Sequence, residues 1–170
     1  YQEESDFEMF YSMYVNTYIE RDVRKIINIK DETKFIKFIS SMAARTAQEL
    51  KYDELAKAVG VSSPTIKNWV SILERSGIVV ILRPYATTLT NRIVKTPKIY
   101  FMDTGLCAYL CRWPTSETLE NGAMDGAFLE TYVVSEIIKS YYNAGKRIDL
   151  YYYRDINQKE IDLLVDGGDK

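Results

Sequence analysis

Apolar residues recur at helical spacing along the first quarter of the chain. Between residues 7 and 27 there is no glycine or proline, and apolar side chains repeat every three or four positions. A second repeat covers residues 35–42, and either Asp31 or Thr33 can cap it at its start. The pattern predicts a helical segment over residues 1–44.

The pattern over residues 55–74 is typical of a helix-turn-helix. Gly60 is placed to end a short first helix in the left-handed conformation that glycine adopts at least cost. Ser63 offers an oxygen that caps a second helix, and Pro64 follows at the first helical position, where its missing N–H costs nothing. The inward-facing residues of this second helix repeat at i, i+3, i+4 and i+7 and are Ile66, Trp69, Val70 and Leu73.

The outward-facing residues of the second helix are of the types that read base edges and hold phosphates. They are Thr65, Lys67, Asn68, Ser71 and Arg75. Strands predicted at 78–82 and 99–101 flank a polar loop, whose basic residues are Arg92, Lys95 and Lys98. A helix-turn-helix followed by a hairpin predicts a winged helix that contacts DNA through the helix and the loop. The alternative is a winged helix that docks on protein.

The charge of the chain is unevenly distributed. The net charge is −2, but residues 41–100 hold nine basic and four acidic residues, whereas both flanking segments are acidic. This asymmetry favours a phosphate-bearing partner for the middle segment. The chain has no histidine, which excludes histidine-based triads, histidine-ligated metals and histidine pH switches. It also has no Walker A pattern, so this chain is not expected to bind ATP as P-loop proteins do.

Two observations bear on the cellular compartment. No apolar run approaches the roughly 20 residues that span a bilayer, so we expect no membrane partner. The only cysteines, Cys107 and Cys111, provide no disulfide framework, which favours a cytoplasmic location. They lie one turn apart on a helix predicted at 104–112, capped by Asp103, and we interpret them as core residues because two thiols alone make a poor zinc site.

A carboxylate interrupts the apolar face of a longer helix predicted at about 126–142. The apolar stripe of that helix consists of Ala127, Val133, Val134, Ile137, Ile138 and Tyr141. Glu130 projects into the centre of this stripe, and a buried carboxylate is costly unless a cation, a metal or a donor compensates it. Glu130 is therefore a candidate site residue, and a structural ion pair with an arginine is the alternative.

Two strands predicted at 148–154 and 160–165 complete the pattern. Alternation places Glu160, Asp162 and Leu164 on one face of the second strand and the apolar residues between them on the other. The two acids then face either the solvent or the helix that carries Glu130. Carboxylates that converge from a helix and a strand suit Mg²⁺.

Four motifs occur in an order that resembles one known family. They are Thr17–Arg24 (TYIERDVR), Ser71–Ile78 (SILERSGI), Lys95–Leu106 (KTPKIYFMDTGL) and Tyr152–Leu163 (YYRDINQKEIDL). The chain resembles the C-terminal half of prokaryotic AAA-superfamily ATPases that end in an uncharacterised domain related to PD-(D/E)xK nucleases. The resemblance implies a P-loop ATPase domain before residue 1, with ATP and Mg²⁺ as cofactors of the intact parent and none for this fragment.

The same resemblance implies that Glu130 is the helix acid and Asp162 the strand acid of a Mg²⁺ site. The family pattern needs a further strand with Glu-x-Lys after the strand acid, and no such strand follows Asp162 in this sequence, so we expect no catalysis by the fragment itself.

We therefore predict an α+β chain with three parts. Residues 1–44 form a lid-like helical segment, 45–101 a winged helix-turn-helix and 102–170 a truncated α/β, restriction-endonuclease-like unit. The predicted function is DNA binding as part of a longer AAA-family ATPase, with the missing ATPase domain and a second copy of the chain as further partners. The alternatives are an inter-domain scaffold and, in the intact parent, a Mg²⁺-dependent nuclease.

Overall fold

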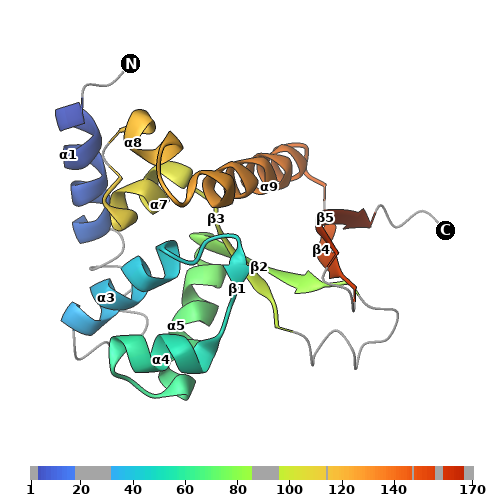
Figure 1. Cartoon of the computed structure of the whole chain (residues 1–170), viewed down its shortest axis with the longest axis horizontal. Coiled ribbons are helices and arrows are strands. Elements are labelled where there is room, and N and C mark those ends of the chain that lie inside the picture. Colours follow the sequence, from blue (N-terminus) through green and yellow to red (C-terminus); the bar gives the residue numbers. More distant parts are fainter. Residues whose placement is uncertain are drawn as a thin grey trace.

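The computed structural model describes residues 4–17, 32–85, 96–113, 115–146, 148–155 and 159–166. Within these ranges, the chain forms helices and the strands of one mixed sheet, which confirms the predicted α+β class (Figure 1). The helices are α1 (Glu4–Tyr14), α3 (Glu32–Ala43), α4 (Tyr52–Val59), α5 (Ser63–Arg75), α7 (Thr104–Cys111), α8 (Ser116–Glu120) and α9 (Asp125–Asn143). The strands are β1 (Gln48–Glu49), β2 (Val79–Pro84), β3 (Lys98–Phe101), β4 (Asp149–Arg154) and β5 (Glu160–Asp166).

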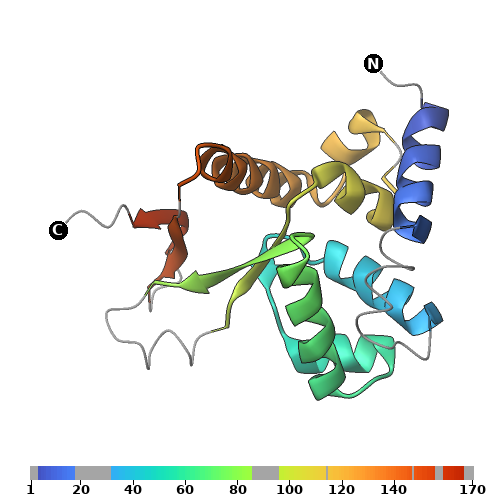
Figure 2. The ribbon, with the colours of Figure 1, turned by 180° about the vertical axis from the view of Figure 1, so that it is seen from behind.

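The five strands form one sheet in the order β1-β3-β2-β4-β5. The β2–β3 pair is antiparallel, with Val79 opposite Phe101, and β1 extends it on the other side of β3. The far end of β2 pairs in parallel with β4 through Arg83 and Tyr151, so the β2–β3 hairpin continues into the β4–β5 hairpin (Figure 2). One sheet thus links the middle of the chain to its C-terminal third.

The turn between α4 and α5 has the geometry that its residues favour. Gly60 adopts the left-handed conformation, with φ of 81°, directly after α4, as its place in the pattern predicts. The cap of α5 was predicted one residue too late: Ser62, not Ser63, accepts the Thr65 N–H at 3.3 Å. The Ser63 hydroxyl instead donates to Asp53 on α4, which ties the two helices together.

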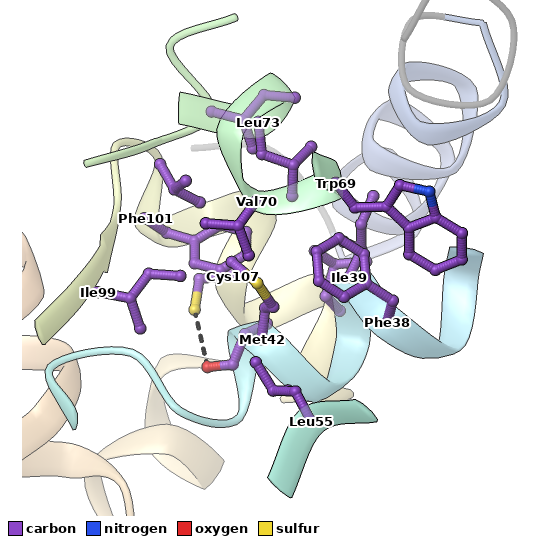
Figure 3. Close-up of a cluster of buried hydrophobic side chains, with 14 of the residues drawn as sticks. Phe38, Ile39, Met42, Leu55, Trp69, Val70, Leu73, Ile99, Phe101 and Cys107 are labelled. Carbon is purple, nitrogen blue, oxygen red and sulfur yellow. Dashed lines mark hydrogen bonds between the residues drawn. The ribbon is translucent and has the colours of Figure 1, made fainter. Parts of the chain in front are cut away.

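The larger core lies where α3, α4, α5 and α7 meet the β2–β3 hairpin (Figure 3). The indole of Trp69 packs edge-on against Phe35, with ring centroids 5.3 Å apart, and lies 5.2 Å from Phe38. Cys107 is buried in this core, where its thiol lies 3.5 Å from the Ala43 carbonyl oxygen, in agreement with its interpretation as a core residue. Asp103 caps α7 as predicted, accepting the Leu106 N–H at 2.9 Å.

A second, smaller core lies between α9 and the sheet, and it corrects the predicted stripe of α9. The buried residues of α9 are Phe128, Thr131, Val134, Ser135 and Ile138, whereas Val133 is exposed. Thr131 is buried because its hydroxyl bonds the Thr46 hydroxyl at 2.8 Å and donates to the Ala127 carbonyl at 2.7 Å. The buried face is therefore rotated, and Glu130 lies at its edge rather than at its centre.

Candidate functional site

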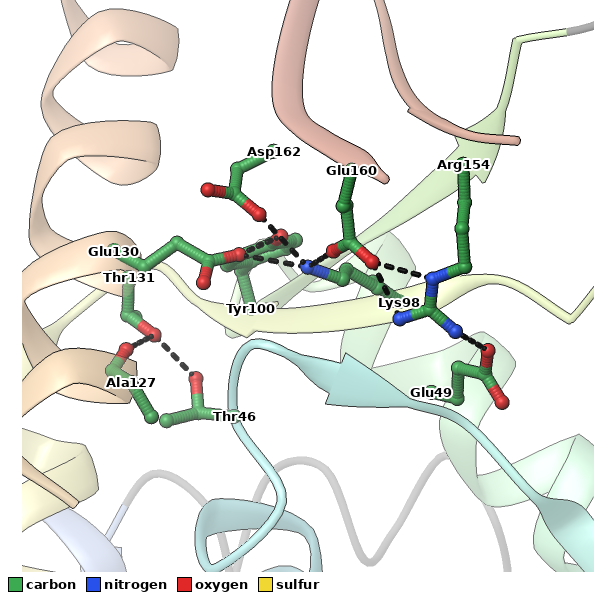
Figure 4. Close-up of polar contacts among 10 residues, drawn as sticks. All are labelled: Thr46, Glu49, Lys98, Tyr100, Ala127, Glu130, Thr131, Arg154, Glu160 and Asp162. Atoms are coloured by element: carbon green, nitrogen blue, oxygen red, sulfur yellow. Dashed lines mark hydrogen bonds and ion pairs between the residues drawn. The ribbon is translucent and has the colours of Figure 1, made fainter. Parts of the chain in front are cut away.

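Charged side chains from β1, β4, β5 and α9 lie around one buried lysine, Lys98 (Figure 4). Lys98 opens β3, which lies between β1 and β2, and only 4% of the residue is exposed. This placement corrects the assignment of Lys98 to the basic loop, because the residue pairs within the sheet opposite Leu82. We call Lys98 and its three acidic partners, Glu130, Glu160 and Asp162, the Lys98 cluster.

The Lys98 ammonium contacts all three acids of the cluster. Its Nζ lies 3.0 Å from Glu130 Oε1 on α9 and 3.3 Å from Asp162 Oδ1 on β5. It also forms a close ion pair with Glu160 Oε1 on β5. The cation that compensates Glu130 is thus this lysine, and not the arginine considered in the sequence analysis.

Two further groups hold the outer sides of the carboxylates. The Tyr100 hydroxyl, two residues along β3 from Lys98, donates to Glu130 Oε1 at 2.6 Å. The Arg154 guanidinium on β4 donates to Glu160 Oε2 and also to Glu49 on β1. Glu160 therefore uses one oxygen for Lys98 and the other for Arg154, which fixes the orientation of its carboxylate.

A β-bulge lies in β5 beside the acids that contact Lys98. Tyr151 pairs with Leu164 and Tyr153 with Ile161, so two residues of β5 lie opposite the single residue Tyr152. Asp162 contacts Lys98 while its neighbour Leu163 packs against the smaller core, where strict alternation placed these two residues on opposite faces. Of the two orientations considered for the acids of β5, the structure has the one directed at the helix of Glu130.

The ionisation of the cluster follows from these contacts. Burial lowers the pKa of Lys98, but its hydrogen bonds with Glu160 and Glu130 outweigh burial and leave the pKa raised. Burial raises the pKa of Glu160, but hydrogen bonds from Lys98 and Arg154 reverse the effect and leave it lowered. Burial and the hydrogen bond to Glu130 both raise the pKa of the Tyr100 phenol. These contacts therefore favour the charged forms of Lys98 and Glu160 and the neutral form of Tyr100.

The Mg²⁺ site implied by the family resemblance does not fit this arrangement. Glu130 and Asp162 do converge, but the Lys98 ammonium lies between their oxygens, within 3.3 Å of both. Among the residues that the structure describes, no group of three or more acidic or cysteine side chains is arranged to hold a metal ion. A metal and an ammonium cannot share one position among the same oxygens.

The helix-turn-helix surface carries the other predicted site residues, and most of them have partners within the chain. Lys67 is exposed and lies over the Tyr52 ring, with Nζ 5.6 Å from the centroid. Arg75 donates to the Ser71 hydroxyl at 3.0 Å, and the Thr65 hydroxyl bonds that of Ser62 at 2.8 Å.

Asn68 is exposed between these residues on α5. Arg92 and Lys95 lie outside the described residues, so their predicted role in DNA binding stays a prediction.

The sequence pattern indicates Glu130 and Asp162 as site residues but does not indicate that Lys98, Tyr100 and Arg154 join them in one cluster. The available signal was the spacing of Lys98 and Tyr100, which share a strand face at i and i+2. Nothing in the spacing says that this face lies against α9 and β5. No helix in the described part of the chain is both long and apolar enough to cross a bilayer.

Comparisons with known proteins place this chain in a family. Residues 1–117 match the family described as "Domain of unknown function (DUF8612)", and residues 125–170 match "Domain of unknown function (DUF4143)", a domain often found in AAA ATPase-associated proteins. Uncharacterised proteins of Mycobacterium tuberculosis and Mycobacterium bovis are each 27% identical to the chain over 154 residues. The match covers 90% of this chain and 34% of each relative, so the chain spans about a third of the length of these relatives. No solved structure matches. The chain belongs to the DUF8612 family.

Proposed function

We propose that this member of the DUF8612 family binds duplex DNA through a winged helix formed by residues 45–101, as part of a longer AAA-family ATPase. The order of elements supports the proposal: α3, β1, α4, α5, β2 and β3 follow one another as in a winged helix, and β1 completes a three-stranded antiparallel arrangement with the β2–β3 hairpin. In this fold the helix equivalent to α5 lies in the major groove.

The observation that carries the proposal is the exposed polar face of α5. Ile66, Trp69 and Val70 are buried, whereas Lys67 and Asn68 are exposed on the opposite side. The first turn of α5 contains no acidic residue of its own, and the positive end of the helix dipole favours a phosphate. Lysine and asparagine at such positions provide a phosphate contact and a base-edge contact.

One intrachain contact opposes phosphate binding at the start of α5 and provides a further test of DNA binding. Asp53 accepts a hydrogen bond from Ser63 at the start of α5, which places a negative charge beside the helix N-terminus. If α5 approaches a phosphate, Asp53→Asn removes a repulsion, and we expect it to strengthen binding. A surface with no role in DNA binding gives no such gain.

The test is fluorescence anisotropy of a labelled duplex titrated with the chain from roughly 50 to 200 mM salt. We expect the affinity to fall steeply with salt, and Lys67→Ala to weaken binding and reduce the salt slope by about one. Lys139→Ala on α9 is the matched control, because it removes the same charge from an exposed pair with Glu136. Equal binding by the Lys67 and Lys139 variants, or no binding at the lowest salt, contradicts the proposal.

A second function, docking on protein, is favoured by the surface of α1. Met9, Phe10 and Met13 are large, apolar and 58%, 53% and 61% exposed. Exposed apolar residues grouped on one helix are typical of protein-binding surfaces. This alternative predicts concentration-dependent association in sedimentation velocity that Met13→Glu abolishes, together with no affinity for duplex DNA.

A further inference from the structure

We propose that the Lys98 ammonium is a built-in counter-ion that takes the position of a divalent cation among Glu130, Glu160 and Asp162 and so excludes metal from this cluster. The proposal is independent of DNA binding, because it concerns α9, β3 and β5 and not α5. It also accounts for the disagreement between these residues and the Mg²⁺ site that the family resemblance implies.

The geometry of the carboxylates is that of ligands around one central cation. Glu130 comes from α9 and the two other acids from β5, and among the residues described it is the Lys98 side chain that contacts all three. Without a cation between them, three carboxylates this close repel one another. A positive charge between the three carboxylates is therefore needed to hold them in this arrangement.

The cluster is built to keep its cation in place. Tyr100 holds Glu130 and Arg154 holds Glu160, so neither glutamate is free to rotate away from Lys98. The Lys98 stem is buried within the sheet, and its Nζ also lies 5.7 Å from the centre of the Tyr152 ring. Because an anchored side chain cannot diffuse away, the ammonium keeps a high effective concentration in the cluster, and a metal ion must displace it in order to bind.

A divalent ion needs carboxylate oxygens at about 2.0–2.6 Å, closer than the 3.0 and 3.3 Å that the ammonium has from Glu130 and Asp162. Removing the ammonium while keeping the side-chain volume leaves the same acids free to close on a metal ion. Lys98→Met is the suitable change, because methionine is unbranched and apolar and fills the space of the lysine stem.

The test is Mn²⁺ binding, measured by electron paramagnetic resonance of the free ion and by isothermal titration calorimetry. We expect Lys98→Met to bind one Mn²⁺ on the order of tenfold or more tightly than the unmodified chain does. Adding Glu130→Gln to Lys98→Met is expected to remove that gain. Lys139→Met is the matched control, since it removes the charge of a lysine that contacts one glutamate on the surface, and we expect no gain from it.

Each outcome decides the proposal. Equal Mn²⁺ affinity of the unmodified chain and Lys98→Met overturns it, whether both bind or neither does. If Lys98→Met is unfolded without metal, circular dichroism with added Mn²⁺ replaces the titration. Folding restored by Mn²⁺ then supports the exchange of one cation for the other, and a variant that stays unfolded at every Mn²⁺ concentration overturns it.

Discussion

Tyr100→Phe removes one hydroxyl from the Lys98 cluster and tests whether the cluster contributes to stability. The Tyr100 side chain is fully buried, and its hydroxyl donates to Glu130 Oε1 at 2.6 Å. Phenylalanine keeps the ring and its packing against the smaller core, so the hydrogen bond is the only interaction lost. A hydrogen bond to a charged group contributes about 1.5–3 kcal/mol. Because the Glu130 side chain is 23% exposed and water reaches it in part, we expect the lower end, about 1.5 kcal/mol.

Urea unfolding measures this change directly. We expect the midpoint to fall with an unchanged slope, which indicates a loss of stability and not a change in the unfolded state. In a thermal scan the same loss corresponds to about 3–6 °C for a chain of this size. A double-mutant cycle with Glu130→Gln separates the bond from other effects, and we expect a coupling of about 1 kcal/mol between the two positions. A loss below about 0.5 kcal/mol, or strictly additive variants, refutes the view that Tyr100 orients Glu130.

Further predictions concern packing and pH. Gly105→Ala places a Cβ 2.1 Å from the Tyr11 hydroxyl oxygen, so Tyr11 must move from α7, and we expect about 1–2 kcal/mol lower stability in urea unfolding. Phe38→Ala empties a fully buried site in the larger core and is expected to cost about 3–5 kcal/mol, measured in the same way. Because the pKa of Glu160 is lowered by folding, its stabilising contribution is present above its unfolded pKa of about 4.3 and is lost as pH falls through the folded value. Unfolding measured from pH 7 to pH 3 should show this loss, and Glu160→Gln should flatten it. Since folding raises the pKa of Lys98, its contribution persists until the pH exceeds about 10.4, the unfolded value.

The elements of this fold are largely predictable because their signals are local. A helix cap such as Asp103, or a left-handed glycine such as Gly60, is decided by a few neighbouring backbone groups, and both were predicted correctly. The helix of Glu130 was expected at 126–142 and is observed as Asp125–Asn143. Two short elements, β1 and α8, were not predicted, because two to five residues carry too little periodicity to be recognised.

The candidate site is only partly predictable, because its signals are not local. Glu130 and Asp162 stand out as acids on otherwise apolar elements. The predicted apolar face of α9 is rotated about the helix axis from the face that is buried, since Thr131 and Ser135 count as polar in any hydrophobicity pattern. The bulge in β5 breaks the alternation that placed Leu163 on the face opposite Asp162. A bulge is decided by pairing with the neighbouring strand, which the sequence of β5 alone does not show.

Strand β3 shows why Lys98 could be mistaken for a loop residue and why its position matters. All four of its residues are buried, with Ile99 and Phe101 in the larger core and Tyr100 in the smaller one. A strand covered on both faces is expected to be uniformly apolar, so a lysine at its start suggests that the strand begins one residue later. The lysine is tolerated here only because α9 and β5 bring three carboxylates to the same face as Tyr100. The cation and the acids therefore depend on one another: without the acids a buried lysine at this position is too costly, and without the lysine the acids must bind another cation or separate.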